Sequence, residues 1–99
     1  MNKNILKQLE YAWSDGFFFN LRNGTFEEQE YEKLKICFDS LKGTEIDFSN
    51  KRVIELLWFI PLFILWQEER LTLKGMPKDK FDEVFNFFYN ECEDLLGLP

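Results

Sequence analysis

The sequence predicts an all-α fold: one domain over residues 1–99, resembling a four-helix bundle whose central helix kinks at Pro61. Three observations favour this fold. Apolar residues recur with the i, i+3, i+4 period of an amphipathic helix in four separate segments. Glycine or proline separates these segments, as expected of short connections between helices. Hydrophobic residues make up 45% of the 99 residues and aromatic residues 18%, which is enough apolar material for a core.

The first helical segment is expected over residues 2–23. Its apolar positions, spaced along one face, are Ile5, Leu6, Leu9, Trp13, Phe17 and Leu21. Gly16 interrupts the segment, which therefore forms either one bent helix or two short ones. Gly24 closes it, because glycine readily adopts the left-handed conformation that follows a helix end.

The second helix is expected to begin at a capping box formed by Thr25 and Glu28, in which each side chain accepts a hydrogen bond from the other residue's amide. Gly43 is expected to end it. The connector at 44–48 is short, and the sequence leaves open whether it is extended. The apolar stripe of this helix is Tyr31, Leu34, Cys37, Phe38 and Leu41.

The third helix is expected over residues 50–71, capped by Asp47 or Ser49. Between residues 53 and 66 apolar side chains occur on all sides, so we expect this to be the central, fully surrounded helix. Pro61 lacks an amide proton and clashes with the preceding turn, so it should kink the helix.

The fourth helix is expected to start around Pro77, which suits a first helical turn, and to end at Gly97. Its apolar stripe is Phe81, Val84, Phe85, Phe88, Cys92, Leu95 and Leu96. No internal repeat or low-complexity tract divides the chain, so a single domain follows.

The charge pattern argues against several classes of protein. With 18 acidic and 12 basic residues the formal charge is −6, which is unsuited to binding nucleic acid. The apolar run at 53–66 is too short for a membrane span and contains Glu55, and no signal peptide is visible. We therefore expect a cytoplasmic protein without nucleic-acid or membrane partners, whose Cys37 and Cys92 are reduced core thiols.

The sequence also lacks the residues of common catalytic sites. It contains no histidine, and both cysteines lie on apolar stripes, so a nucleophile activated by histidine is excluded. It has neither a glycine-rich phosphate loop nor clustered metal ligands. We expect no catalytic residues, no cofactor and no bound metal, and hence a protein that is not an enzyme.

Two groups of acidic residues are not explained by the packing of a core. The last turns of the fourth helix carry carboxylates, where the helix dipole disfavours anions. These carboxylates are Glu91, Glu93 and Asp94. With Asp82 and Glu83, nearer the start of the helix, they form a predicted acidic band that faces away from the core, with Phe87 as a possible anchor. A second group lies at the start of the second helix: Glu27, Glu28, Glu30 and Glu32. The alternatives are a solvated surface, a lysine from another helix that pairs with the first group, and stabilisation of the second group by the helix dipole.

Several aromatic residues also lie outside the apolar stripes. A helix cannot point Phe17, Phe18 and Phe19 all inward, and Phe87 is out of phase with its neighbours. Another helix or the connector at 44–48 covers these rings, or they are exposed anchors of an interface.

The stretch from Trp13 to Phe26 (WSDGFFFNLRNGTF), followed by the stripe at 31–41, resembles the front of small acidic helical immunity proteins. Such proteins accompany bacterial polymorphic toxins, including those of contact-dependent growth inhibition systems. The resemblance covers about a third of the chain. It implies tight, specific inhibition of one toxin domain inside the producing cell, and many such toxins are nucleases with basic clefts.

Two functional hypotheses follow. In the first, the protein is a monomer or a weak dimer whose acidic surface binds a basic cognate toxin domain. In the second, it is a structural or regulatory homodimer whose surplus aromatic residues, Phe18 and Phe87 among them, form the subunit interface.

Overall fold

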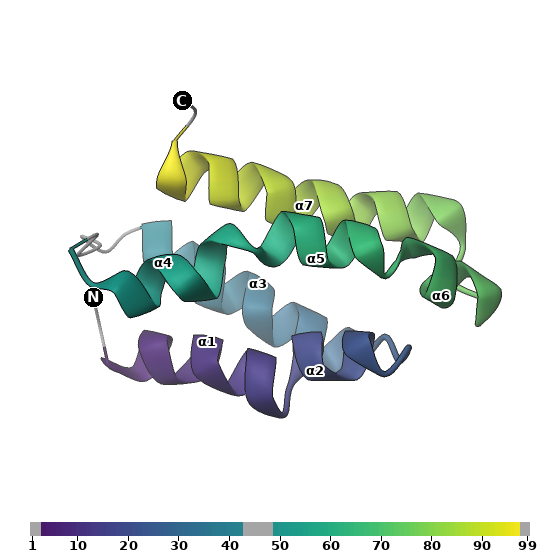
Figure 1. Cartoon of the computed structure of the whole chain (residues 1–99), viewed down its shortest axis with the longest axis horizontal. Helices are drawn as coiled ribbons and strands as arrows, with labels where there is room; N and C mark the ends of the chain where they lie inside the picture. Colours follow the sequence, from purple (N-terminus) through teal and green to yellow (C-terminus); the bar gives the residue numbers. More distant parts are fainter. Residues whose placement is uncertain (1–2, 43–48, 98–99) are drawn as a thin grey trace.

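The computed structural model describes residues 3–42 and 49–97, and every regular element in these ranges is a helix (Figure 1). The first segment of the chain contains α1 (Lys3–Ser14) and α2 (Phe17–Arg22), and the second is α3 (Glu28–Lys42). The third contains α4 (Lys51–Trp58), α5 (Ile60–Trp66) and α6 (Glu68–Leu73), and the fourth is α7 (Lys78–Leu96). The all-α prediction is confirmed. The expected end at Gly43 and the connector at 44–48 lie outside the described residues.

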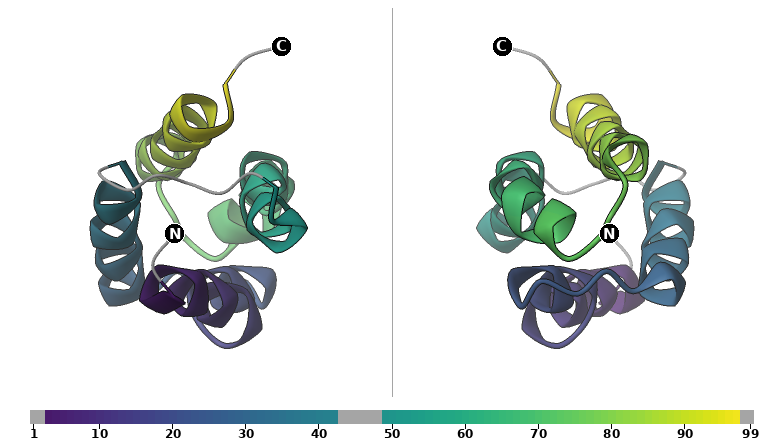
Figure 2. Two further views of the ribbon diagram at one scale, coloured as in Figure 1. Left: turned by 90° about the vertical axis from the view of Figure 1, so that its left-hand side faces the viewer. Right: turned by 90° about the vertical axis from the view of Figure 1, so that its right-hand side faces the viewer.

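The four segments lie side by side around one core, as Figure 2 shows from the two ends of the molecule. The first segment contacts α3 and α4, and α7 contacts α4, α5 and α6. Consecutive segments run in opposite directions, but α3 and the α4–α6 segment lie at opposite corners (Figures 1 and 2). As a result, α3 and α7 are parallel neighbours with their C-terminal ends at the same end of the molecule.

Gly16 divides the first segment into two helices, which settles the alternative that the sequence left open. The Gly16 and Asp15 amides both donate to the Tyr11 carbonyl, at 2.8 Å each. A Cβ atom at Gly16 would lie 2.8 Å from the Tyr11 ring and 3.1 Å from the Cα of Ala12. Only glycine therefore fits this break without moving the backbone or ring of α1.

Gly24 closes α2 as predicted, with a φ of 82°. Its amide donates to the Leu21 carbonyl and the Thr25 amide to the Asn20 carbonyl, each at 2.8 Å, which is a Schellman motif. The predicted capping box is wrong, because α3 begins only at Glu28. Thr25 belongs instead to the turn that ends α2.

The third segment begins at Asn50, whose side chain accepts from the Arg52 amide at 3.0 Å, and not at the predicted cap Ser49. The other predicted cap, Asp47, lies outside the described residues. It is interrupted at Phe59, two residues before Pro61. Pro61 has no amide proton to donate to the Leu57 carbonyl. The structure thus shows a break in the helix before Pro61, while the predicted kink at Pro61 itself stays a prediction.

Side chains from two other segments bond to the carbonyls at this interruption. The indole Nε1–H of Trp13 in α1 donates to the Leu56 carbonyl at 3.0 Å, and the Cys92 Sγ–H of α7 donates to the Leu57 carbonyl at 3.4 Å. Since an unpaired buried carbonyl is costly, the indole bond compensates for the irregular backbone at Leu56. The Leu57 carbonyl also accepts a backbone N–H at the end of α4, and the two side-chain bonds together tie three segments to one another.

The prediction that the third segment is a fully surrounded central helix is wrong. This segment occupies one corner, and only one of its sides faces the core (Figure 2). Its buried residues are Val53, Leu56, Leu57, Ile60, Phe63, Ile64 and Leu71. Apolar residues on its other side are exposed, because no further helix among the described residues covers them.

The core is rich in aromatic rings that contact one another. Phe88 of α7 lies within 6.0 Å, centroid to centroid, of Phe17, Phe18, Tyr31 and Phe38. Together these rings join the first, second and fourth segments. Aromatic pairs of this kind stabilise the fold by more than the free energy gained from burying their apolar area.

Trp13→Phe is expected to destabilise the fold by about 1 kcal/mol, because it leaves the Leu56 carbonyl without the indole donor. Urea unfolding followed by circular dichroism measures the change. Trp66→Phe is the matched control: Trp66 is exposed, so its loss should change stability by less than about 0.5 kcal/mol. Equal effects of the two substitutions would contradict a structural role for the indole bond.

Candidate functional site

The acidic residues predicted along the first half of α7 are neutralised by lysines. Lys78 lies 2.8 Å from Asp82 and also 2.5 Å from Glu68 of α6. Lys80 lies 3.2 Å from Glu83, whose carboxylate also accepts from the Tyr31 hydroxyl at 3.4 Å. These contacts link α6, α7 and α3, so Asp82 and Glu83 belong to the packing between segments more than to a free acidic surface.

Glu91 does not lie on an outward acidic band, contrary to the prediction. Its side chain is only 9% exposed and pairs through Oε1 with the Lys42 ammonium at 2.9 Å. Its other oxygen, Oε2, is buried without a hydrogen-bond partner. Lys42 is the last residue of α3, so it approaches α7 because the two helices are parallel neighbours. A lysine from another helix was one of the alternatives that the sequence left open.

Glu93 and Asp94 are the remaining members of the predicted band. Glu93 is half-buried and Asp94 is exposed, and neither forms an ion pair within residues 3–42 and 49–97. The hydrogen bond to Glu91 and the charge of Glu91 raise the pKa of Lys42, and the fields of Asp39 and Asp94 add to this. This end of α7 therefore keeps some negative charge at the surface, balanced in part by one lysine.

The second acidic group, at the start of α3, is also largely paired. Glu30 lies 3.4 Å from Lys33, Glu32 lies 3.4 Å from Lys35, and Glu28 lies 3.4 Å from Lys80. Exposed pairs of this kind contribute little to stability, but they reduce the charge that a partner would meet. Glu27 is exposed and has no ion pair in the part of the chain that the structure describes.

Phe87 is not an exposed anchor. It is half-buried and packs edge-on against Tyr31 and Phe38 of α3, at 6.0 and 6.2 Å between ring centroids. Phe17 and Phe18 are fully buried, whereas Phe19 is exposed, so the expectation that the three consecutive rings cannot all point inward is confirmed. Phe18 and Phe87 are therefore unsuitable as residues of a subunit interface.

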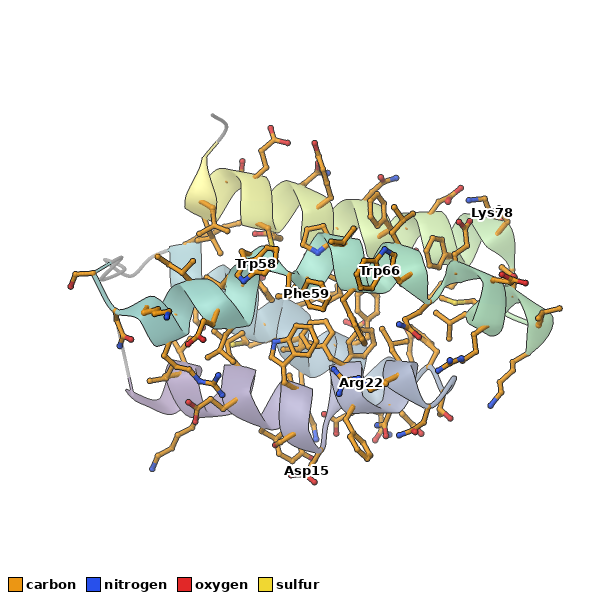
Figure 3. The ribbon with its side chains drawn as sticks, viewed as in Figure 1. Asp15, Arg22, Trp58, Phe59, Trp66 and Lys78 are labelled. Carbon is orange, nitrogen blue, oxygen red and sulfur yellow. The ribbon has the colours of Figure 1, made fainter. Side chains whose placement is uncertain are left out.

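The sequence interpretation missed an exposed apolar surface on α4 and α5. We call Trp58, Leu62, Leu65 and Trp66 the aromatic face. Trp58 is 55% exposed and Trp66 63% exposed, and the two leucines between them are exposed as well. The half-buried Phe59 bridges the two indoles, with ring centroids 5.3 Å from Trp58 and 5.4 Å from Trp66. Figure 3 shows both tryptophans on the same side of the molecule.

A hollow of about 400 Å³ continues the aromatic face at the α6 end. Trp66 and the exposed Leu73 line it, together with charged side chains of α6 and the following turn. Among these, Arg70 donates to the Arg22 carbonyl, and Lys74 donates to the Asn23 carbonyl at 3.3 Å. The two cations thus bind the end of α2, and the hollow combines an apolar wall with a charged rim.

A regular pattern in the sequence could have identified this surface. Trp58, Leu62, Leu65 and Trp66 follow one another at i, i+4, i+7 and i+8, which is a complete helical stripe. It is separate from the stripe that contains Leu57, Ile60 and Ile64. Two apolar stripes on one helix fit a central helix, but they equally fit a corner helix with an exposed outer surface.

The described cysteine and acidic side chains neither cluster as metal ligands nor present a reactive thiol. No group of three or more acidic or cysteine side chains within the described ranges could hold a metal ion. Both cysteines are free and buried, and burial raises the pKa of the Cys37 thiol to about 11 and that of Cys92 to about 12. Thiols of this kind are poor nucleophiles at neutral pH. No helix in the described part is both long and apolar enough to cross a membrane.

Comparison with known proteins yields no match: no protein-family model, no curated protein and no solved structure is significantly similar to this chain.

Lys42→Met is expected to lower the urea midpoint more than Glu91→Gln does, because only the first substitution leaves a buried carboxylate without its counter-ion. Adding Glu91→Gln to Lys42→Met should therefore raise the midpoint again, as urea unfolding of the four proteins will show. The ion pair with Glu91 raises the pKa of Lys42 above its usual 10.5. The contribution of this pair to the stability of the fold is therefore present at neutral pH, and it is lost as the pH rises through the pKa that Lys42 has in the folded protein. Additive effects of the two substitutions would contradict this coupling.

Both thiols should be unreactive in the native protein at mildly alkaline pH, because they are buried and their pKa values are raised. A chromogenic aryl disulfide reagent measures this directly. In the native protein we expect the coloured aryl thiolate to be released slowly, at a rate set by opening of the fold. In urea we expect rapid release of two equivalents per chain, one for each cysteine. Fast labelling of either cysteine without denaturant would contradict the packing described here.

Proposed function

We propose that this protein is a non-catalytic immunity protein, which binds the toxin domain of a bacterial polymorphic toxin in the cytoplasm of the producing cell and blocks its activity. The observation that carries this proposal is the aromatic face. Two tryptophans and two leucines form a contiguous exposed surface on α4 and α5, although the same chain buries most of its other large apolar residues.

Exposed tryptophans are the kind of residue on which protein interfaces depend most. Tryptophan is enriched among the few residues that carry most of the binding free energy. Contiguous apolar patches are uncommon on proteins that do not use them for binding. The rings of Trp58, Phe59 and Trp66 also support one another, so a partner would meet a surface that is already ordered.

The charge of the chain favours a basic partner. A chain with a net charge of −6 would attract a positively charged domain over a distance, and this attraction would accelerate the encounter. A nuclease toxin with a basic cleft is a domain of this kind. Most of the acidic residues near α7 and at the start of α3 are paired with lysines. We therefore assign the acidic residues a role in steering, and the aromatic face the role of contact.

A second candidate function, a structural or regulatory homodimer, would use the same aromatic face. Lys51 and Glu69 lie near opposite ends of the α4–α6 segment, and both are exposed. A two-fold antiparallel arrangement would therefore bring Lys51 of one copy near Glu69 of the other. The charge of −6 on each copy opposes this association, which is why we rank it second.

Trp58→Glu/Trp66→Glu should abolish protection of cells that express the proposed toxin partner, to be sought among the products of neighbouring genes, and weaken binding of that domain by about a hundredfold or more. The matched control is Ile36→Glu/Tyr89→Glu, which adds the same charge at exposed apolar positions of α3 and α7. Growth assays and calorimetry measure the two effects, and circular dichroism confirms that both variants are folded.

The possible outcomes separate the two functions. Full protection by Trp58→Glu/Trp66→Glu would remove the aromatic face as the contact surface, and no protection by the natural sequence would overturn the immunity function. Light scattering that shows a dimer which this variant dissociates would support the homodimer instead.

A further inference from the structure

A groove of about 390 Å³ lies between α1 and α3. Its volume falls in the range of about 300–1,000 Å³ that is typical of sites for small molecules. Ala12 of α1 and Cys37 of α3 line it with short side chains, and both are buried, as is the neighbouring Leu34. The two helices therefore leave space above an apolar floor.

The edges of this groove are apolar as well. Tyr11 of α1 is 50% exposed and Ile36 of α3 is 68% exposed, and both side chains line the groove. Neither side chain belongs to the core, whose surface at the groove is formed by the buried Ala12 and Cys37. A ligand with an apolar body would cover these side chains and gain the free energy of removing them from water.

The charged residues at the rim carry a local surplus of positive charge, in contrast to the chain as a whole. Lys7 and Lys33 line the groove against a single carboxylate, that of Glu30. Lys33 lies 3.4 Å from Glu30 but is 72% exposed, so this pair is weak and easily exchanged. Lys7 is exposed and forms no ion pair in the described ranges. Both ammonium groups are thus available to an anion.

We propose that the α1–α3 groove is a binding site for a small amphipathic carboxylate, whose apolar body lies on Ala12, Leu34 and Cys37 and whose carboxylate is held at the rim by Lys7. The combination of an apolar floor, apolar edges and two cations at the rim selects this class of ligand over neutral apolar molecules and over hydrophilic anions. The site is independent of the proposed function, because α1 and α3 do not contribute to the aromatic face (Figures 1 and 2).

Titration of the isotope-labelled full chain with decanoate, followed by amide chemical shifts, tests the site. We expect saturable shifts confined to residues 7–12 and 30–37, and much weaker binding of decanol, which has the same chain without the charge. Lys7→Glu should weaken decanoate binding by about fivefold. The matched control, Lys51→Glu, makes the same change in net charge on α4 and should leave the affinity unchanged.

A second variant tests the apolar part of the site: Ile36→Asp, at an exposed position, should weaken both decanoate and decanol. The proposal is overturned by shifts that fall on residues 58–73, by equal affinity for decanoate and decanol, or by no binding. It is also overturned if the groove residues shift with protein concentration alone, because a second copy of the chain would then be the occupant.

Discussion

The architecture depends on how the interruption of the third segment is stabilised. Pro61 cannot donate a hydrogen bond, so the backbone before it departs from a regular helix at Phe59. The indole of Trp13 and the thiol of Cys92 bond to the carbonyls at this point from two different segments. An irregularity that would weaken an isolated helix thus becomes the place where the first and fourth segments are held to the third.

The same interruption lets the third segment present two surfaces. Its inner side buries Val53, Leu57 and Ile64 against the core, while its outer side leaves Trp58 and Trp66 in water. A fold with four segments has four outer sides, and the other three carry mainly charged and polar residues. The arrangement of the segments does not by itself call for apolar residues on this outer side, and exposed apolar patches of this kind are typical of binding surfaces.

Local features of the structure could be predicted from the sequence where they depend on neighbouring residues. The left-handed turn at Gly24, the helix end at Gly97 and an interruption at Gly16 each follow from the conformational freedom or small size of glycine, although only the structure shows that Gly16 separates two helices. The burial of Cys37 and Cys92 followed from helical periodicity. The capping box at Thr25 failed for an equally local reason, because the Schellman motif of α2 uses the Thr25 amide.

Features that depend on which segments are neighbours could not be predicted in this way. Glu91 follows the buried Phe88 by three residues and the buried Val84 by seven, so its spacing places it at the edge of the apolar stripe, but no basic residue follows Lys80 in the sequence. Its counter-ion is Lys42, which reaches it because α3 and α7 are parallel and adjacent. Phe87 is covered for the same reason, by Tyr31 and Phe38 of α3.

This arrangement also changes what the acidic residues contribute to function. Had α7 faced α3 in the opposite direction, Lys42 would lie far from Glu91, and the end of α7 would expose a dense anionic patch. In the structure the carboxylates near α3 and α7 are distributed among lysines of neighbouring helices, and the net charge of −6 acts as a diffuse field rather than as a contact. A diffuse field accelerates encounter but selects no precise orientation, so specificity must come from surfaces with shape. Of the two surfaces that we propose as binding sites, the aromatic face is the one with this role toward a protein partner, and the α1–α3 groove is a separate site for a small ligand.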